Sequence, residues 1–278
     1  MIRNPGFAVA HPGYKAVQGN IQKRTKMLNL FDAHLHIIDY RFPLVANQSY
    51  LPNEFTVTDY LNIAKPLHII GGAVVSGSFQ AFDQTYLVNA LQTLGPNFVG
   101  VTQLPATVHD EQIIELNQQG IRGIRFNLKR GGSETVEHLS DMAHRVYEIA
   151  KWHVELYVDA SELAELTDLL LAVPALSIDH MGLSKDGLPV LFELVEQGVK
   201  VKASGFSRVD FDVAKTLKTI ASINPDALMF GTDLPSTRAP QPFKKEDITF
   251  LLDIFDEHMA NKILLTNAAD FYRLQFKN

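Results

Sequence analysis

The sequence predicts an α/β fold, a (β/α)₈ barrel of the TIM type. Eight short and nearly continuous apolar segments alternate with segments of helical periodicity. Strands of this kind are typical of a parallel sheet that is buried on both faces. An open, doubly wound sheet is the alternative, but it usually carries a glycine-rich phosphate turn after its first strand. His34 and His36 occupy that place here, so the barrel is favoured.

Each predicted strand is followed by at least one predicted helix. Thr56 and Asp59 have the spacing of a capping box before the first helix, and Ser161 is expected to cap the fifth. We expect strands at Leu30–His36, Ile69–Ser76, Phe98–Leu104, Gly123–Leu128, Val154–Asp159, Leu176–His180, Val199–Ser204 and Leu228–Asp233. We expect helices at Tyr60–Lys65, Gln80–Leu94, Asp110–Gln119, Glu134–Trp152, Ser161–Val173, Leu188–Gln197, Phe211–Ile223, Lys245–Met259 and Asn261–Leu274.

Residues 1–26 differ in composition from the rest of the chain. They contain basic but no acidic residues, and their prolines and glycines interrupt any regular element. We expect an N-terminal extension at 1–26 on the surface of a single barrel domain at 27–278. An organellar transit segment is the alternative, although no amphipathic helix is evident.

Composition restricts the class of protein. The formal net charge is −6, which argues against nucleic acid as the main partner, and no apolar run is long enough to cross a membrane. The chain has no cysteine, so a metal ion would have to be held by His, Asp, Glu or Lys. No apolar secretory segment is present at the N-terminus, so we expect a cytoplasmic protein. The sequence leaves open whether it forms a homo-oligomer.

Two histidines lie two residues apart at the end of the first predicted strand. His34 and His36 therefore point to one face of the strand, which in a barrel is the lumen. Two imidazoles there can bind one metal ion, or they can orient a water molecule and a substrate oxygen. The alternative is a pair of hydrogen-bonded packing residues.

Two further residues with catalytic chemistry follow apolar segments. Asp233 ends the eighth predicted strand, where a carboxylate can accept a proton from an attacking water. His180 ends the sixth, where an imidazole can polarise a carbonyl or bind a leaving oxygen. Taken singly, Asp233 could cap a turn and His180 could be a packing residue, and Asp32 is expected to be structural. In barrels of this kind strand ends carry the active groups, so the combination indicates a catalytic site.

Several motifs resemble those of the amidohydrolase superfamily. The segments FDAHLH at 31–36, IDHMG at 178–182 and FGTDLP at 230–235 are similar to its hallmark strands. NAADFY at 267–272 resembles the closing helix of the amidohydrolase-related branch, which includes 2-pyrone-4,6-dicarboxylate lactonase and sugar-acid lactonases. The resemblance covers nearly everything from residue 28 onward. It implies a TIM barrel and hydrolysis of a lactone or ester bond in a small, carboxylate-bearing substrate.

The resemblance also implies roles for individual residues. Asp233 would activate water, and the three histidines would surround the attacked carbonyl. Guanidinium groups bind carboxylates through two parallel hydrogen bonds, so arginines would hold the anionic substrate. The alternative for these arginines is a surface position or a pair with Asp159 or Asp179. The implied substrate contacts are Arg125, Arg130, Arg208, Tyr157, Ser78 and Tyr50.

The sequence does not decide whether the protein binds a metal ion. Many superfamily members carry a metal-binding Lys or Glu after strand four and a His after strand five, and this sequence has Arg125 at the former place and no histidine at the latter. A binuclear centre is therefore not expected. We expect that no cofactor is required, and the alternative is a single divalent ion such as zinc held by His34, His36 and Asp233.

Two other functions remain compatible with the same barrel. Decarboxylases of aromatic or unsaturated acids resemble these motifs and need a metal ion, so metal analysis with and without chelation would separate them from a lactonase. A non-catalytic barrel that binds a small anion is the third possibility. A general base beside three imidazoles argues against it, because a binding protein does not need one.

Overall fold

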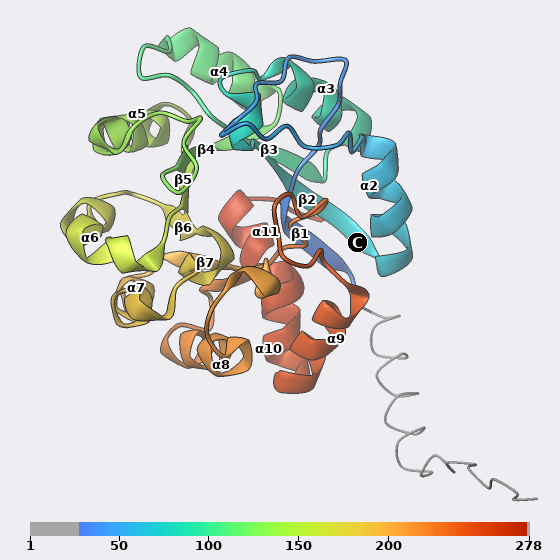
Figure 1. The fold of residues 1–278 in the computed structure, drawn as a ribbon, viewed down its shortest axis with the longest axis vertical. Coiled ribbons are helices and arrows are strands. Elements are labelled where there is room, and N and C mark those ends of the chain that lie inside the picture. Colours follow the sequence, from blue (N-terminus) through green and yellow to red (C-terminus); the bar gives the residue numbers. More distant parts are fainter. Residues whose placement is uncertain (1–27, 277–278) are drawn as a thin grey trace, which may run out of the picture.

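The computed structural model describes residues 28–276, and the extension expected at 1–26 lies outside the described residues. Eight parallel strands follow one another around a barrel in sequence order, with helices around them (Figure 1). This order confirms the predicted (β/α)₈ barrel, because a doubly wound sheet reverses its strand order. The strands are β1 (Leu30–Leu35), β2 (Ile69–Val75), β3 (Phe98–Thr102), β4 (Ile121–Asn127), β5 (His153–Tyr157), β6 (Leu176–Ile178), β7 (Lys200–Ala203) and β8 (Leu228–Phe230).

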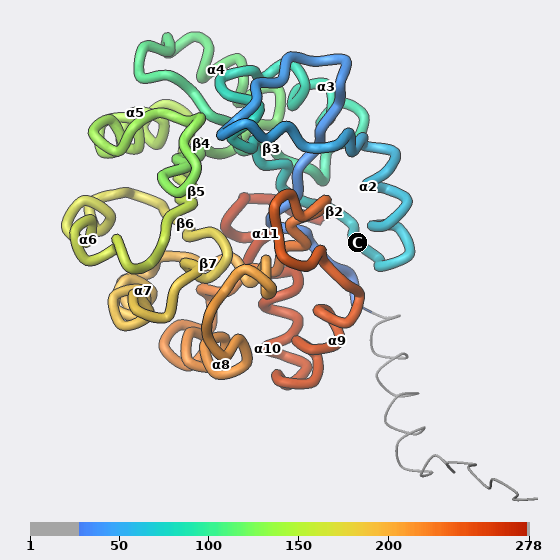
Figure 2. The backbone as a smooth tube through the Cα atoms, in the orientation of Figure 1, coloured from blue at the N-terminus to red at the C-terminus, as the bar shows by residue number. Residues whose placement is uncertain are grey.

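The helices surround the barrel, except for the last one, which lies inside the ring in Figure 1. They are α2 (Val57–Ala64), α3 (Thr85–Leu94), α4 (Asp110–Gln118), α5 (Leu139–Ala150), α6 (Leu163–Leu171), α7 (Leu188–Glu196), α8 (Val213–Ile223), α9 (Lys245–Ile254), α10 (Glu257–Asn261) and α11 (Asn267–Tyr272). Their apolar sides pack on the sheet in one large core, apart from α11, whose Ala268 and Tyr272 form a second cluster with strand residues such as Phe31 and Val101. In Figure 2 the colour runs in sequence around this ring, so that the last helices return to the side of the first strand. No helix of residues 28–276 combines the length and the apolar character that a membrane span needs.

The ends of the barrel meet through backbone and side-chain hydrogen bonds. The Asp233 amide donates to the His34 carbonyl at 2.7 Å, and the His36 amide donates to the Leu234 carbonyl at 2.8 Å. Buried Asp32 accepts from the Thr232 amide at 2.8 Å and from the Thr232 hydroxyl at 2.6 Å. Asp32 therefore joins β1 to the segment after β8, which is the structural role that the sequence indicated.

A glycine allows this close approach. A Cβ atom at Gly231 would lie only 2.7 Å from the Cβ atom of His34. Any side chain there would push β8 away from β1, so Gly231 is needed where the barrel closes.

The caps and helix lengths differ in part from the sequence-based expectations. The capping box is confirmed, since the Thr56 amide donates to the Asp59 carboxylate at 2.8 Å. The cap expected at Ser161 is wrong: Asp159 caps this turn and accepts a hydrogen bond from the Ser161 amide at 3.2 Å. The helix expected at Lys245–Met259 ends at Ile254, because Asp256 caps a new helix there.

The strands also end earlier than expected. The strand expected at Leu176–His180 ends at Ile178, and the one expected at Leu228–Asp233 ends at Phe230. His180 and Asp233 lie just beyond, in left-handed backbone conformations with φ of 50° and 58°. Such conformations are costly for residues other than glycine and concentrate at functional sites. They turn both side chains from the strand ends toward the barrel axis.

Candidate active site

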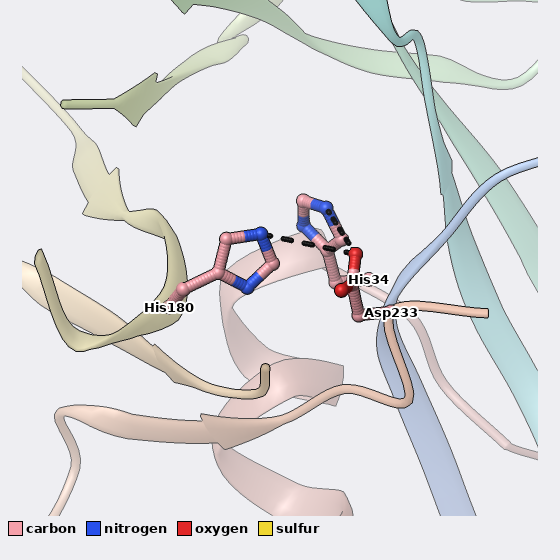
Figure 3. Close-up of side chains that lie close together, drawn as sticks. All are labelled: His34, His180 and Asp233. Carbon is pink, nitrogen blue, oxygen red and sulfur yellow. Dashed lines mark ion pairs between the residues drawn. The ribbon is translucent and has the colours of Figure 1, made fainter. Parts of the chain in front are cut away.

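The predicted catalytic residues converge at the carboxyl ends of the strands. The Oδ1 atom of Asp233 lies 3.6 Å from Nε2 of His36, 3.8 Å from Nε2 of His180 and 3.9 Å from Nε2 of His34. All four side chains are buried, and Figure 3 shows His34 and His180 directed at the carboxylate. One carboxylate oxygen is thus surrounded by three ring nitrogens from two distant parts of the chain.

Two atoms at the centre of this group lack a hydrogen bond. Nε2 of His34 and Oδ1 of Asp233 are both buried, and neither has a partner among residues 28–276. A buried polar atom without a partner is costly, and in native proteins it usually faces a water, a ligand or an ion. The gap between these atoms is therefore the place where a reacting group would bind.

The other oxygen of Asp233 is held by an arginine. Nε and Nη2 of Arg208 donate to Oδ2 at 2.8 and 2.6 Å, and Nη2 also donates to the Thr237 carbonyl at 2.8 Å. Burial would raise the pKa of Asp233, but its interactions with the neighbouring His180 ring and the Arg208 guanidinium group hold this pKa well below its usual value. Asp233 is therefore ionised, with Oδ2 fixed and Oδ1 free to accept a proton.

Gly205 makes room for this contact. It adopts φ of 61°, and a Cβ atom there would lie 2.8 Å from Cδ of Arg208 and 2.9 Å from Nδ1 of His180. A side chain at this position would displace both residues. The turn after β7 thus needs glycine in order to pack Arg208 against the site.

The Nδ1 atoms of two of these histidines also lie within hydrogen-bonding distance of a partner. Nδ1 of His36 lies 2.7 Å from the Val75 carbonyl, and Nδ1 of His180 lies 2.8 Å from the Ser204 hydroxyl. A carbonyl can only accept, so Nδ1 of His36 carries a proton, and Nε2 of a neutral His36 ring is then an acceptor. Burial lowers the pKa of His34 to about 4 and the pKa of His180 well below its usual value, so both rings are neutral near pH 7.

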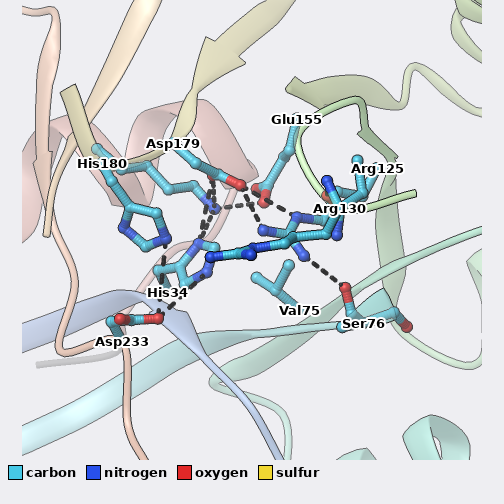
Figure 4. A network of polar contacts seen from close by, with 12 residues as sticks. His34, Val75, Ser76, Arg125, Arg130, Glu155, Asp179, His180 and Asp233 are labelled. Atoms are coloured by element: carbon cyan, nitrogen blue, oxygen red, sulfur yellow. Dashed lines mark hydrogen bonds and ion pairs between the residues drawn. The ribbon is translucent and has the colours of Figure 1, made fainter. Parts of the chain in front are cut away.

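A network of buried charges lies around these histidines (Figure 4). Nε and Nη2 of Arg125 donate to Oδ2 of Asp179 at 3.0 and 2.8 Å, and Nη1 donates to the Ser76 carbonyl at 2.9 Å. Of the two alternatives considered for Arg125, the pair with Asp179 is therefore present. Deeper in the barrel, buried Lys202 donates to Glu155, which also accepts from the Tyr272 hydroxyl at 2.6 Å.

Sequence reasoning missed Lys202 and Glu155. Each is a charged residue between two apolar neighbours inside a predicted strand, β7 and β5 respectively, although β7 also begins with Lys200. In a buried parallel strand such a residue must find a partner, and the two strands are close in the barrel order. A charged residue between two apolar residues inside a buried strand is thus the signal that could have identified this pair.

The six predicted substrate contacts line one cavity beside the catalytic group. The cavity also includes Arg238, Asn127 and Thr237, which were not named as contacts, and its free volume is about 40 Å³. Ligand pockets are usually several hundred Å³, so side chains at the mouth must move to admit a substrate. A neighbouring cavity of about 350 Å³ reaches Asp233 from the side of the loops after β7 and β8. The predicted contacts are Tyr50, Ser78, Arg125, Arg130, Tyr157 and Arg208.

Arg238 covers the mouth of the smaller cavity. Its guanidinium group lies 4.4 Å from the centre of the Tyr50 ring, and Nη1 donates to Oδ1 of Asn47 at 3.3 Å. Nη2 donates to the Asn47 carbonyl. These contacts join the loop after β8 to the loop after β1. No sequence motif distinguished Arg238, because it lies in an irregular loop whose path the apolar pattern does not specify.

The cavity carries excess positive charge. Arg125 and Arg208 are paired with Asp179 and Asp233, whereas Arg130 and Arg238 have no carboxylate partner within the described part of the chain. Burial and the charge of Arg130 lower the pKa of Arg238. Four guanidinium groups against two carboxylates leave two positive charges, and such a cavity favours an anion of opposite charge.

The catalytic group also has the composition of a metal site. Ligand atoms of His34, His180 and Asp233 lie within 4.8 Å of one another, so this compact trio contains His180 where the sequence suggested His36. The two unpartnered atoms described above belong to the trio, and histidine nitrogens with a carboxylate oxygen suit zinc. These three residues would hold a divalent ion, which would polarise a substrate carbonyl.

The chain is similar in sequence to two proteins that are named as hydrolases. The sequence is 26% identical over 232 residues to a 2-pyrone-4,6-dicarboxylate hydrolase of Comamonas testosteroni, which covers 73% of this chain and 76% of the relative. It is 24% identical over 266 residues to a 4-sulfomuconolactone hydrolase of Rhizobium radiobacter, with 87% and 89% covered.

Solved structures show the same fold. A crystal structure of a protein from Agrobacterium tumefaciens has a TM-score of 0.79 at 20% identity and covers 89% of this chain and 97% of that chain. A probable 2-pyrone-4,6-dicarboxylic acid hydrolase from Acinetobacter baumannii, solved with citric acid bound, has a TM-score of 0.76 at 23% identity, with 89% and 100% covered. The sequence profile of the amidohydrolase family matches residues 31–274, which is nearly the whole described chain, and the protein therefore belongs to the amidohydrolase family.

Proposed function

We propose that this protein hydrolyses the lactone bond of a small substrate that carries two anionic groups. The observation that carries the proposal is the environment of Asp233. Its Oδ2 atom is fixed by Arg208, and its free Oδ1 atom faces three imidazole nitrogens at 3.6 to 3.9 Å. A proton acceptor, polar groups for a carbonyl and an anion-binding cavity thus meet at one place.

The attacking water is activated between two acceptors. Oδ1 of Asp233 and Nε2 of His36 lie 3.6 Å apart, so one water molecule can donate a hydrogen bond to each. Asp233 takes one proton as the water oxygen bonds to the lactone carbonyl carbon. The carbonyl oxygen gains negative charge, which His34 and His180 face from the other side of the group.

Ring opening completes the reaction. The bond between the former carbonyl carbon and the ring oxygen breaks, and the ring oxygen takes the proton that Asp233 received from water. The products are a carboxylic acid, which then releases its proton to solvent to become a carboxylate, and a hydroxyl or enol group, so atoms and charges balance. Arg208 holds the Asp233 carboxylate in one position during both proton transfers.

The charge of the cavity supports a dianionic substrate. Its two excess positive charges are supplied by Arg130 and Arg238, on opposite loops at the mouth. The relatives named for 2-pyrone-4,6-dicarboxylate and 4-sulfomuconolactone act on lactones with two acidic groups, and one structural neighbour binds citric acid. We expect the anionic groups of the substrate to replace the Arg238 contacts with Asn47 as the mouth opens.

The experiment is direct turnover of two dianionic lactones. Purified protein is mixed with 2-pyrone-4,6-dicarboxylate or with 4-sulfomuconolactone, and ring opening is followed by the loss of lactone absorbance. Turnover of at least one of them, and weaker turnover of a lactone with one acidic group, is expected. Carbon dioxide release without ring opening would instead identify a decarboxylase, and no reaction with any lactone would refute the proposal.

A further inference from the structure

Lys202 is a buried cation with a direct contact to the active site. It lies in β7 with no exposed surface, donates to Oε2 of Glu155, and its Nζ atom is 3.6 Å from Oδ1 of Asp179. Two nearby carboxylates stabilise the ammonium form, which has three donors and no acceptor. Nζ also lies 3.1 Å from Nδ1 of His34. In this hydrogen bond the lysine must donate, and Nδ1 of His34 must accept.

The position of the His34 proton follows from this contact. A neutral imidazole carries one N–H group, and a ring whose Nδ1 atom faces an ammonium group at 3.1 Å accepts there and is neutral. Since Nδ1 accepts from Lys202, the proton lies on Nε2. Oδ1 of Asp179 is only 3.3 Å from the same Nδ1 atom and could accept a proton from it. The lysine contact is the shorter of the two, at 3.1 Å, and an ammonium group cannot accept a hydrogen bond, so the geometry favours donation from Lys202.

We propose that Lys202 is a positioning residue that holds the proton of His34 on Nε2. Building on the lactone hydrolysis proposed above, His34 then presents an N–H group to the carbonyl oxygen as negative charge develops on it. His36, with its Nδ1 proton on the Val75 carbonyl, presents an acceptor to the water. The two histidines at the end of β1 thus have opposite hydrogen-bonding roles, because the Nδ1 atom of His34 contacts a donor and the Nδ1 atom of His36 contacts an acceptor.

The same contact disfavours a metal ion on His34. A metal-bound histidine offers an unprotonated nitrogen to the ion and usually donates its other N–H group to a carboxylate or a carbonyl. Asp179 is placed for that role, but Lys202 occupies the Nδ1 atom of His34. Loss of the lysine should release Nδ1 to donate to Asp179 and leave Nε2 with its lone pair toward the cavity.

The test is the nitrogen NMR spectrum of His34. The full-length protein is labelled with ¹⁵N-histidine, and the His34 signals are assigned by their loss in His34→Gln. In the wild type we expect a protonated Nε2 and an unprotonated Nδ1, and in Lys202→Met the reverse. Lys200→Met is the matched control, since Lys200 lies in the same strand and donates to the Asp226 carbonyl. A protonated Nδ1 in the wild type, or a Lys202→Met spectrum unchanged from it, would overturn the proposal.

A second variant keeps the test informative if Lys202→Met fails to fold, because it removes the buried positive and negative charges together. Lys202→Met leaves Glu155 buried without its cation, so Lys202→Met/Glu155→Gln is made beside it and should show the same proton shift. Zinc titration by calorimetry should show affinity roughly tenfold tighter in these variants than in the wild type and in Lys200→Met. If a folded variant carries the His34 proton on Nδ1 but binds zinc no more tightly than the wild type, Lys202 does not disfavour a metal ion on His34.

Kinetics separate this inference from the proposed function. On a lactone substrate, Lys202→Met should lower kcat by about 100-fold with little change in KM, because a transition-state donor is lost. The spectra and the zinc titration need no substrate. If the wild type opens no lactone, the proposed function fails while the proton position of His34 is still measured. If turnover is found but the proton lies on Nδ1, only the role of Lys202 fails.

Discussion

The burial of a neutral His34 has a measurable effect on stability. Burial lowers its pKa from 6.5 to about 4 in the folded protein. Below pH 6.5 His34 binds a proton in the unfolded chain but not in the folded protein, so protonation favours unfolding. The stabilising effect of the neutral ring is fully present above the unfolded pKa and is lost as the pH falls toward about 4. His180, whose pKa is also lowered by burial, acts in the same direction.

The magnitude follows from the size of the shift. The full shift corresponds to about 3 kcal/mol, of which about 2 kcal/mol is lost between about pH 7 and about pH 5. Asp32 acts in the opposite direction, because burial raises its pKa to about 6 and the folded protein then retains a proton that the unfolded chain releases. The slope of the wild type alone therefore does not isolate His34, and a variant is needed.

The assay measures the free energy of unfolding in urea for the wild type and for His34→Gln, at about pH 7 and at about pH 5. The wild type should lose about 2 kcal/mol more free energy of unfolding than the variant over this interval, since the Asp32 and His180 effects are common to both. Equal losses in the two proteins would refute the reasoning, because His34 would then titrate in the folded state as it does in the unfolded chain.

Four further outcomes are expected. Arg130→Met should raise KM for a dianionic lactone about tenfold with kcat nearly unchanged, whereas Lys129→Met, whose lysine is paired outside the cavity, should not. Arg238→Met should raise KM more for a dianionic than for a monoanionic lactone, and an equal effect on both would exclude the proposed anion contact. Asp32→Ala should lower the free energy of unfolding by about 3 kcal/mol, measured in urea, because both Thr232 donors lose their acceptor. Dialysis against a chelator should leave turnover unchanged, and recovery only after addition of zinc would show that a metal is required.

The barrel could be predicted because the burial of its strands leaves a recognisable apolar pattern in the sequence. Parallel strands with both faces covered appear as apolar runs, and all eight predicted strands are present. Their ends were placed less well, since the backbone leaves the ladder before the polar residues that were expected to end the strands. Ile178 and Phe230 end their strands, whereas the expected strands ran on to His180 and Asp233. The side chains were still placed at the correct end of the barrel, because the chain turns there over only a few residues.

Residues of the candidate site could be predicted where their spacing in the sequence, or their place at the end of a strand, fixes where they lie. The spacing of His34 and His36 fixes their common face, and strand ends gather at one rim whatever their separation in sequence. The partners of these residues depend on packing across the barrel. Lys202 reaches His34 over 168 positions of chain, and Arg238 reaches Asn47 over 191, and no local pattern encodes either distance.

The central claim is that Asp233 is the group that takes the proton from the attacking water. The measurement is steady-state turnover of the best dianionic lactone by Asp233→Asn, with the exposed Asp253→Asn as the control. We expect kcat to fall by about 10³-fold in Asp233→Asn while substrate still binds, and to stay at the wild-type value in the control. A folded Asp233→Asn protein with a kcat near that of the wild type would contradict the account.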